Sequence, residues 1–180
     1  VVCAHRHAVS QGCPRILLSA GIHGDEPAGP LAILEHLAEG AFSDQFEWVL
    51  FPAINPAGLL RGTRDNASGI DLNRDFLRRQ SPETRFFIEQ VEGFRGFDLH
   101  LSLHEDWEYD KAYLYELNSG GHPSIAAELL RVTDQCIGLV DAAEIDGHIP
   151  TARGFIRHAL EPDEPEGWPE AIYLTQRFPI

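Results

Sequence analysis

The sequence predicts an α/β fold, and three observations support that prediction. Short apolar runs typical of buried strands alternate along the chain with amphipathic stretches at helical spacing. Polar residues suited to chemistry follow directly after the strands, where open α/β sheets place their ligands. The chain has 180 residues, of which 43% are apolar, so we expect one domain with a packed core.

The first half of the chain predicts two strands and one helix. Residues 15–20 form a short apolar run that indicates a buried strand. After a loop rich in turn formers, Ala28 to Glu39 has apolar residues at helical spacing, up to a glycine stop. Phe46 to Ile54 predicts the next strand, which the dipeptide Asn55-Pro56 ends. We expect a long polar loop from Ala57 to about Asp75.

The second half continues the alternation. Ser81-Pro82-Glu83 indicates a helix start, because it combines a capping residue, a proline at the first position and a carboxylate at the positive helix end. Phe97 to Leu103 predicts a third strand, and Tyr113 to Leu117 a fourth. An amphipathic helix is expected between Pro123 and Cys136, and a last strand over Ala171 to Leu174.

The charge and the cysteines exclude several classes of partner. Asp plus Glu number 28 and Lys plus Arg 14, so the net charge is −14. Nucleic acid and anionic membrane surfaces would be repelled. No apolar run approaches the roughly 20 residues of a bilayer span, and the first residues lack a signal-peptide layout. Three cysteines without a C-x-x-C pair favour a reducing compartment, so we expect a cytoplasmic protein.

The first candidate site is the stretch His23-Gly24-Asp25-Glu26, which leads into the first predicted helix. A histidine and a carboxylate three residues apart at a helix start can reach one metal ion, and zinc accepts both ligand types. Without other motifs, this pattern is not specific for a metal site. The alternative is a surface histidine beside a carboxylate that caps the helix.

The second candidate site is the third predicted strand. Side chains alternate on a strand, so His100, Ser102 and His104 share one face, while leucines occupy the other. Two histidines with one glutamate and an open water position make a hydrolytic zinc site. For His100 the alternative is a core histidine satisfied by hydrogen bonds.

The third candidate site is the loop over residues 63–76, which carries two arginines and two asparagines. Arginine binds carboxylates through two parallel hydrogen bonds, so this loop could hold an anionic group. The alternative is that the arginines of this region, Arg64, Arg74, Arg78 and Arg79, pair with local acids.

Taken together, the stretches at 23–26, 55–58 and 69–76, followed by a histidine at a strand end, resemble the zinc metallocarboxypeptidase family. That family includes an aspartoacylase and succinylglutamate desuccinylase branch, and the resemblance covers roughly residues 15–118. It implies a mixed, mostly parallel central sheet with helices on both faces. It also implies a single zinc-peptidase-like catalytic domain over residues 1–180, incomplete at its C-terminus.

The resemblance also implies roles for individual residues. One Zn²⁺ would be bound by His23, Glu26 and His104. Arg64 would polarise the scissile carbonyl, with Arg61 as the alternative. Asn73 and Arg74 would hold the substrate's carboxylate. His100 stays open as the third ligand, because Asp98-Leu99-His100 matches the aspartoacylase branch while Ser102-Leu103-His104 matches the peptidases.

One expected residue is missing. Family members activate the attacking water with a glutamate on a late strand, and no residue of this chain matches it. Glu105 lies beside a ligand on a strand, so its side chain is expected to point away from the metal. The acids of the proline-rich segment, Glu161, Glu164, Glu166 and Glu170, are expected in a solvated loop and none is assigned the role. Tyr113 and Tyr115 are candidates for the family's substrate-capping tyrosine.

The function that the sequence favours is a zinc-dependent hydrolase that cleaves an amide bond next to a free carboxylate. A small peptide or a peptidoglycan fragment is the expected substrate. The first alternative is an N-acyl amino-acid deacylase of the aspartoacylase or succinylglutamate desuccinylase type. The second, motivated by the missing glutamate, is a metal-binding module that recognises carboxylates without catalysis.

Overall fold

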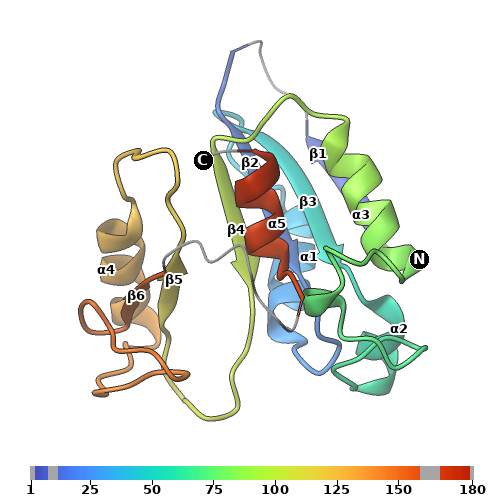
Figure 1. Cartoon of the computed structure of the whole chain (residues 1–180). Helices are drawn as coiled ribbons and strands as arrows, with labels where there is room; N and C mark the ends of the chain where they lie inside the picture. The colour runs from blue at the N-terminus through green and yellow to red at the C-terminus, as the bar shows by residue number, and fades with distance from the viewer. Residues whose placement is uncertain (1–2, 8–11, 159–166, 179–180) are drawn as a thin grey trace. The chain divides into compact units, whose positions relative to one another are not determined.

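A computed structural model describes residues 3–7, 12–158 and 167–178 (Figure 1). The described residues form two compact units. The first contains the chain up to Glu105 together with residues 167–178, and the second contains residues 106–158. The single catalytic domain expected over residues 1–180 stays a prediction.

The elements of the first unit follow one another in the α/β order. They are β1 (Cys3–His7), β2 (Arg15–Ala20), α1 (Ala28–Glu39), β3 (Glu47–Ala53), α2 (Pro56–Arg61), the 3₁₀ turn η1 (Leu72–Arg74), α3 (Pro82–Glu92), β4 (Leu99–Leu103) and α5 (Glu170–Arg177). The second unit contains β5 (Leu114–Glu116), α4 (Ala126–Cys136) and β6 (Phe155–Arg157).

The first unit is built on a sheet with the strand order β1-β3-β2-β4. β2 runs parallel to β3 and to β4, whereas β1 pairs antiparallel with β3 at the edge. In this register Leu17 lies beside His100, and Ser19 lies beside Ser102. The predicted mixed, mostly parallel sheet is therefore confirmed, and its parallel strands end at one common edge.

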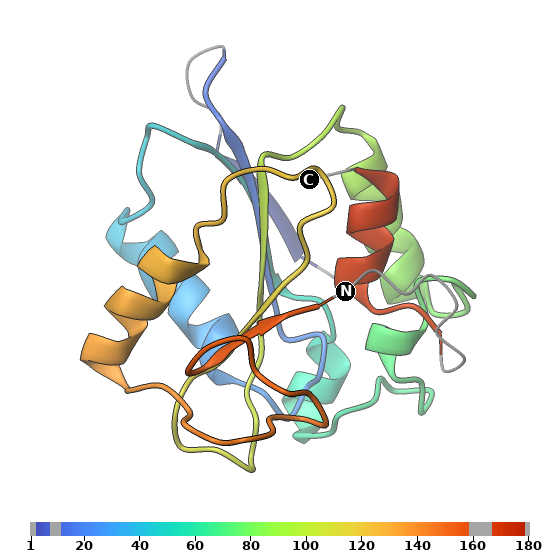
Figure 2. The same ribbon diagram turned by 60° about the vertical axis from the view of Figure 1, so that its left-hand side comes forward.

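Helices cover both faces of this sheet, as the fold class required. α1 lies on one face, and α3 and α5 lie on the other (Figures 1 and 2). On the α1 side, Leu18 and Ala20 of β2 pack with Ile33 of α1. On the other side, Phe51 of β3 meets Phe87 of α3 with 4.4 Å between their ring centroids. Burying both faces explains the near-continuous apolar runs of β2 and β3.

Local sequence signals account for the elements that lie inside the expected long loop. At α2, Asn55 Oδ1 accepts a hydrogen bond from the Gly58 amide, and a proline occupies the first turn. At η1, Asp71 Oδ1 accepts from the Asn73 amide. Capping therefore orders parts of the polar segment that periodicity alone marks as loop.

The strand predicted over Ala171 to Leu174 is wrong, because these residues form part of α5. A run of four apolar residues has no periodicity that separates a strand from a buried helix. Pro169 precedes the helix, and its carbonyl accepts a hydrogen bond from the Tyr173 amide at 3.1 Å. Ile172, Tyr173 and Leu174 are all buried, so three apolar side chains in succession pack inward from one short helix.

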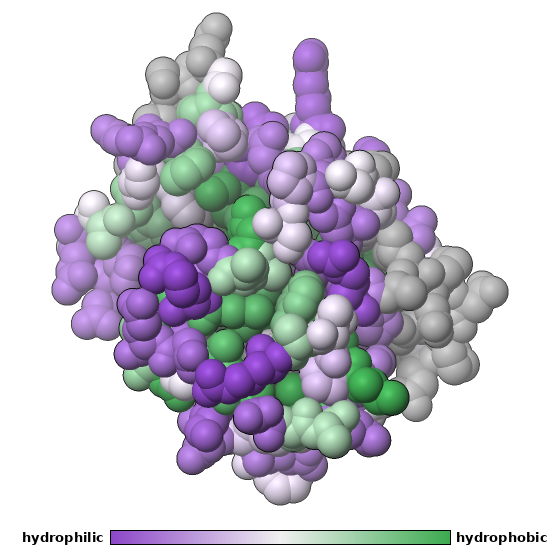
Figure 3. All heavy atoms as spheres, turned by 90° about the vertical axis from the view of Figure 1, so that its left-hand side faces the viewer, coloured by the Kyte–Doolittle hydropathy of each residue, from purple (hydrophilic) through white to green (hydrophobic). Residues whose placement is uncertain are grey.

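The second unit has a two-stranded parallel sheet, β5-β6, and a small core of Val140, Ile145 and Ile156. Hydrophilic and hydrophobic residues are mixed on the side that carries α4 and β6 (Figure 3). Within the described ranges, no helix has both the length and the apolar character that crossing a bilayer demands.

Candidate metal centre

Three side chains that the sequence analysis selected meet at the carboxyl ends of β2 and β4. His23 and Glu26 lie in the loop between β2 and α1, and His104 directly follows β4. The two oxygens of Glu26 lie 2.7 Å from Nδ1 of His23 and 2.9 Å from Nδ1 of His104. The three ligand atoms fall within 4.8 Å of one another. The parallel topology thus joins residues that are about 80 positions apart in the chain.

Gly24 allows the loop at 23–26 to pack against the loop at 55–58. A Cβ atom on Gly24 would lie 2.0 Å from the carbonyl carbon of Gly58, which no side chain tolerates. The two backbones are therefore in direct contact. Asn55, which is fully buried, fixes the second loop by accepting from Gly58 and donating from Nδ2 to the Arg64 carbonyl at 3.1 Å.

The centre concentrates negative charge around its imidazoles. Burial alone would raise the pKa of Glu26, but hydrogen bonds from His104 and His23 outweigh it and lower that pKa to about 2. Burial would lower the pKa of His23, yet its contacts with Asp71 and Glu26 raise it. Glu26 is therefore a carboxylate at neutral pH. The negative charges of Glu26 and Asp71 favour a positive charge at the centre.

The donor set fits a zinc ion. Two imidazole nitrogens and one carboxylate oxygen are ligands that zinc prefers, and three protein ligands leave a position for water. Each histidine presents Nδ1 to the centre and turns Nε2 outward. Nε2 of His23 is buried, and its nearest acidic neighbour is Asp71, whose Oδ1 lies 3.4 Å away in an ion-pair contact.

His104, and not His100, lies together with His23 and Glu26. Nε2 of His100 is 3.3 Å from Ser19 Oγ and 3.1 Å from Glu170 Oε1. These contacts match the alternative interpretation of a core histidine satisfied by hydrogen bonds. The Glu105 carboxylate accepts from the Ala28 amide at the start of α1.

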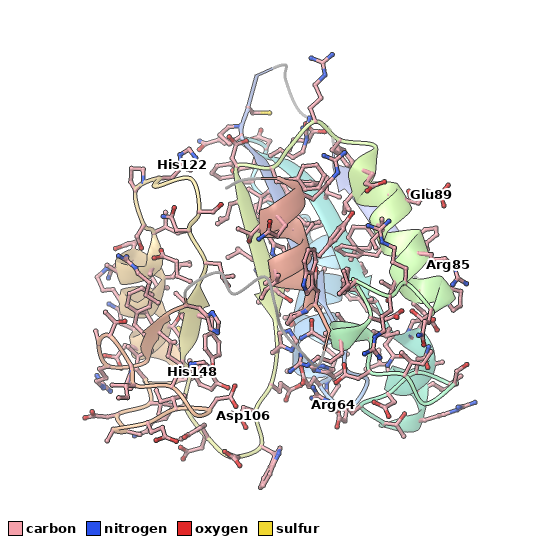
Figure 4. All side chains as sticks on the ribbon, in the orientation of Figure 1. Arg64, Arg85, Glu89, Asp106, His122 and His148 are labelled. Carbon is pink, nitrogen blue, oxygen red and sulfur yellow. The ribbon has the colours of Figure 1, made fainter. Side chains whose placement is uncertain are left out.

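Arg64 lies at the margin of the centre, beyond the carboxyl ends of the strands (Figure 4). Its Nη2 is 3.0 Å and its Nε is 3.1 Å from Oδ2 of Asp71. Asp71 thus contacts both Arg64 and His23, and these two partners hold its pKa well below the ordinary range despite its burial. Arg61 is exposed in the last turn of α2, and among the described residues the ion pairs of Asp71 are with His23 and Arg64.

The loop of Asn73 and Arg74 lies beside a pocket of about 210 Å³. The pocket is lined by Gly69, Ile70, Asp71, Arg74, Asp75, Arg78 and Gln80. Nη1 of Arg74 donates to the Asn73 carbonyl at 2.9 Å, and Asn73 Oδ1 accepts from the Glu170 amide at 2.9 Å. Asn73 therefore already caps α5, a contact that its expected role as a substrate ligand did not include.

The sequence analysis missed Glu170. It was expected in a solvated loop, but only 1% of it is exposed. Burial would raise its pKa, yet the charge and hydrogen bond of His100, with Ser19, lower it. Its position directly after a proline, ahead of an apolar run, was the available signal for a helix start. Glu161, Glu164 and Glu166 lie outside the described residues.

The two tyrosine candidates both belong to the second unit. Tyr113 donates to Asp106 and Tyr115 to Asp146, and burial with these carboxylates raises the pKa of each phenol. Whether either tyrosine meets a substrate stays a prediction.

Comparison with known protein families identifies the family of the chain. Residues 12–113, more than half of the chain, match the succinylglutamate desuccinylase/aspartoacylase catalytic domain.

Curated relatives with significant similarity carry carboxypeptidase names. Human Carboxypeptidase D is 30% identical over 149 residues, a match that covers 62% of this chain and 11% of the relative. Carboxypeptidase E of Caenorhabditis elegans is 34% identical over 117 residues, covering 52% of this chain and 24% of the relative. The chain therefore spans a quarter or less of the length of these two proteins.

Solved structures share the fold over nearly the whole chain. A candidate metallopeptidase from Shewanella denitrificans OS217 has a TM-score of 0.80 and 26% identity, covering 98% of this chain and 66% of the other. A metallo-carboxypeptidase from Pseudomonas aeruginosa, solved in complex with (2-guanidinoethylmercapto)succinic acid, has a TM-score of 0.65 and 23% identity. It covers 98% of this chain and 48% of the other, and it shows likeness of fold alone.

Proposed function

Because the chain belongs to the succinylglutamate desuccinylase/aspartoacylase catalytic-domain family, we propose that it is a zinc-dependent hydrolase that cleaves an amide bond next to a free carboxylate. The observation that carries the proposal is the convergence of His23, Glu26 and His104 on one point, with an arginine-bearing pocket in the same unit. Bound zinc would supply Lewis acidity and a water molecule whose pKa falls to about 7.

The residues around the centre have separate roles in this proposal. His23, Glu26 and His104 bind the metal ion. Arg64, held in place by Asp71, donates hydrogen bonds to the oxyanion that forms when the scissile carbonyl is attacked. Asn73 and Arg74 bind the free carboxylate of the substrate beside the pocket. We assign the role of general base to no residue of this chain.

We propose a small peptide or peptidoglycan fragment as the substrate class. The carboxypeptidase names of the curated relatives support this choice, as does a pocket whose lining includes Arg74 and Arg78. An N-acyl amino-acid deacylase is the second candidate, since the matched family contains succinylglutamate desuccinylase and aspartoacylase. The three cysteines without a C-x-x-C pair support a cytoplasmic setting.

The test compares substrates and metal states. Peptides with free C-termini are incubated with the protein beside N-acetyl-aspartate and N-succinyl-glutamate, each with and without a chelator. We expect turnover of the peptides, its loss on chelation and its return with Zn²⁺. Hydrolysis that survives full metal removal contradicts zinc dependence. Zinc binding without turnover of any substrate favours the metal-binding, carboxylate-recognising module instead.

A further inference from the structure

Glu170 is a buried carboxylate to which the proposed hydrolysis gives no role. It lies in the first turn of α5, which begins near the carboxyl ends of the strands and runs back along the sheet (Figure 1). Its Oε1 is 3.1 Å from Nε2 of His100, and its Oε2 accepts from Ser102 Oγ at 3.2 Å. A buried carboxylate requires such partners. The hydroxyl group of Ser102, however, also contacts a second side chain, that of His104.

Ser102 links Glu170 to the candidate metal centre. Its Oγ lies 3.3 Å from Nε2 of His104, two residues along the same face of the chain. A hydroxyl group has one proton, and a carboxylate can only accept. When Ser102 donates to Glu170, its lone pairs face the imidazole, so Nε2 of His104 is the donor in that contact.

In the metal-loaded protein, where Nδ1 binds the ion instead of donating to Glu26, the direction of these hydrogen bonds fixes the tautomer of His104. A neutral imidazole carries one proton, and placing it on Nε2 leaves the lone pair on Nδ1. Nδ1 is the atom that faces Glu26, 2.9 Å from its Oε2. A metal ligand must present an unprotonated nitrogen, so this tautomer is the one that the centre needs.

We propose that Glu170, acting through the hydroxyl group of Ser102, is a positioning residue that keeps the proton of His104 on Nε2 and presents Nδ1 to the metal ion. The inference rests on the zinc centre of the proposed function. The other histidine has a carboxylate on the same outer side, because Asp71 Oδ1 lies 3.4 Å from Nε2 of His23. His23 thus contacts the carboxylate of Asp71 directly, whereas His104 is linked to the carboxylate of Glu170 through Ser102.

Glu170 has a second contact, which decides the choice of variants. Its amide donates to Asn73 Oδ1, so replacing Glu170 could also disturb the loop proposed to bind the substrate. Ser102 has no such contact and isolates the hydrogen-bond chain. Ser102→Ala removes the link, whereas Ser102→Thr keeps a hydroxyl group.

The experiment measures Zn²⁺ affinity by competition with a chromophoric chelator. We expect Ser102→Ala to weaken zinc binding about 10- to 100-fold, the range found for partners of metal ligands. Ser102→Thr should restore most of the affinity. Glu170→Gln should have a smaller effect than Ser102→Ala, because its amide oxygen still accepts but carries no charge. The double variant should match Ser102→Ala, since both residues act through one chain of bonds.

Nuclear magnetic resonance of the imidazole nitrogens gives a second readout that does not depend on activity. In the zinc-loaded protein we expect His104 to be protonated at Nε2. Tyr173→Phe is the control, because it removes a different hydrogen bond of α5, to Glu92, and should leave zinc affinity unchanged.

Two results overturn the inference. One is an unchanged zinc affinity in a folded Ser102→Ala variant, and the other is a loaded wild-type protein with the His104 proton on Nδ1. Either result leaves the zinc centre itself standing. A wild-type protein that binds no zinc overturns the proposed function together with this inference.

Discussion

At the scale of single residues, two arginines that the sequence could not separate differ in their surroundings. Arg64 is bound to Asp71, which also contacts His23, so its guanidinium is tied to the candidate centre. Its backbone is held as well, because its carbonyl accepts from Asn55 Nδ2. Arg61 is exposed in α2, and no ion pair involves it within the described part of the chain.

We therefore expect Arg64→Ala to lower kcat/KM about 100- to 1,000-fold, the usual cost of removing an oxyanion donor. Arg61→Ala is the matched control and should stay close to wild type. Steady-state kinetics on the peptide substrate, with zinc content measured in each variant, make the comparison. An equal loss in both variants would show that Arg64 has no special role.

The contact between Gly24 and Gly58 is also a residue-scale feature. Gly24→Ala would place a methyl group 2.0 Å from a backbone carbon, so one loop must move. We expect a destabilisation of about 3 kcal/mol or more, together with weaker zinc binding, because overpacking in a rigid contact displaces the backbone. Urea unfolding measures the first effect and chelator competition the second. Gly96→Ala, with open space around its added methyl group, should change neither.

At the scale of elements, α5 shows where a sequence pattern is insufficient. β2 and α1 were predicted with their observed bounds, since each combines a clear period with clear ends. The four apolar residues at 171–174 gave no period, and the helix depends on tertiary contacts. Tyr173 provides two of them: its ring lies 5.5 Å from that of Phe76, and its hydroxyl donates to Glu92 at 3.0 Å.

Tyr173→Phe tests this attachment. Removing a hydrogen bond to a charged acceptor should cost about 1.5–3 kcal/mol, less whatever solvent access to Glu92 restores. Burial and the Glu92 carboxylate raise the pKa of Tyr173 to about 12. The unfolded phenol ionises near pH 10, so this contribution is full below pH 10 and is lost as the pH rises toward 12. Urea unfolding at neutral and alkaline pH should show a larger loss of stability in wild type than in the variant, which keeps Tyr113 and Tyr115.

At the scale of the whole molecule, binding of the metal ion should stabilise the folded protein. A ligand that binds the folded state alone adds about 4 kcal/mol at a thousand times its Kd. For a chain of this size that amounts to a rise in Tm of about 8–16 °C. We expect Zn²⁺ to produce such a rise in a thermal scan of metal-free protein. His23→Ala should abolish it, whereas an equal rise in that variant would place the binding elsewhere.

The arrangement of the whole molecule also explains which site residues could be predicted from the sequence. The sheet order brings the ends of β2 and β4 together, so the metal ligands could be proposed from strand ends and residue types. Glu170 could not, because its contacts with His100 and Ser102 span about 70 residues and depend on how α5 packs. Asp71 belongs to the motif at 69–76, but its contact with His23 is a tertiary contact that the motif does not predict. Long-range polar contacts are thus what the local pattern omits.

The backbone contact between residues 24 and 58 also restricts how this sequence can vary. Gly24 cannot gain a side chain while the loop at 55–58 stays in place, and a Cβ at Gly58 would lie 2.3 Å from Nδ2 of Asn55 within its own loop. A library randomised at both positions and selected for folded protein should therefore return glycine at each. The loop at 55–58 thus restricts both positions, position 24 through its backbone at Gly58 and Leu59 and position 58 through the side chain of Asn55.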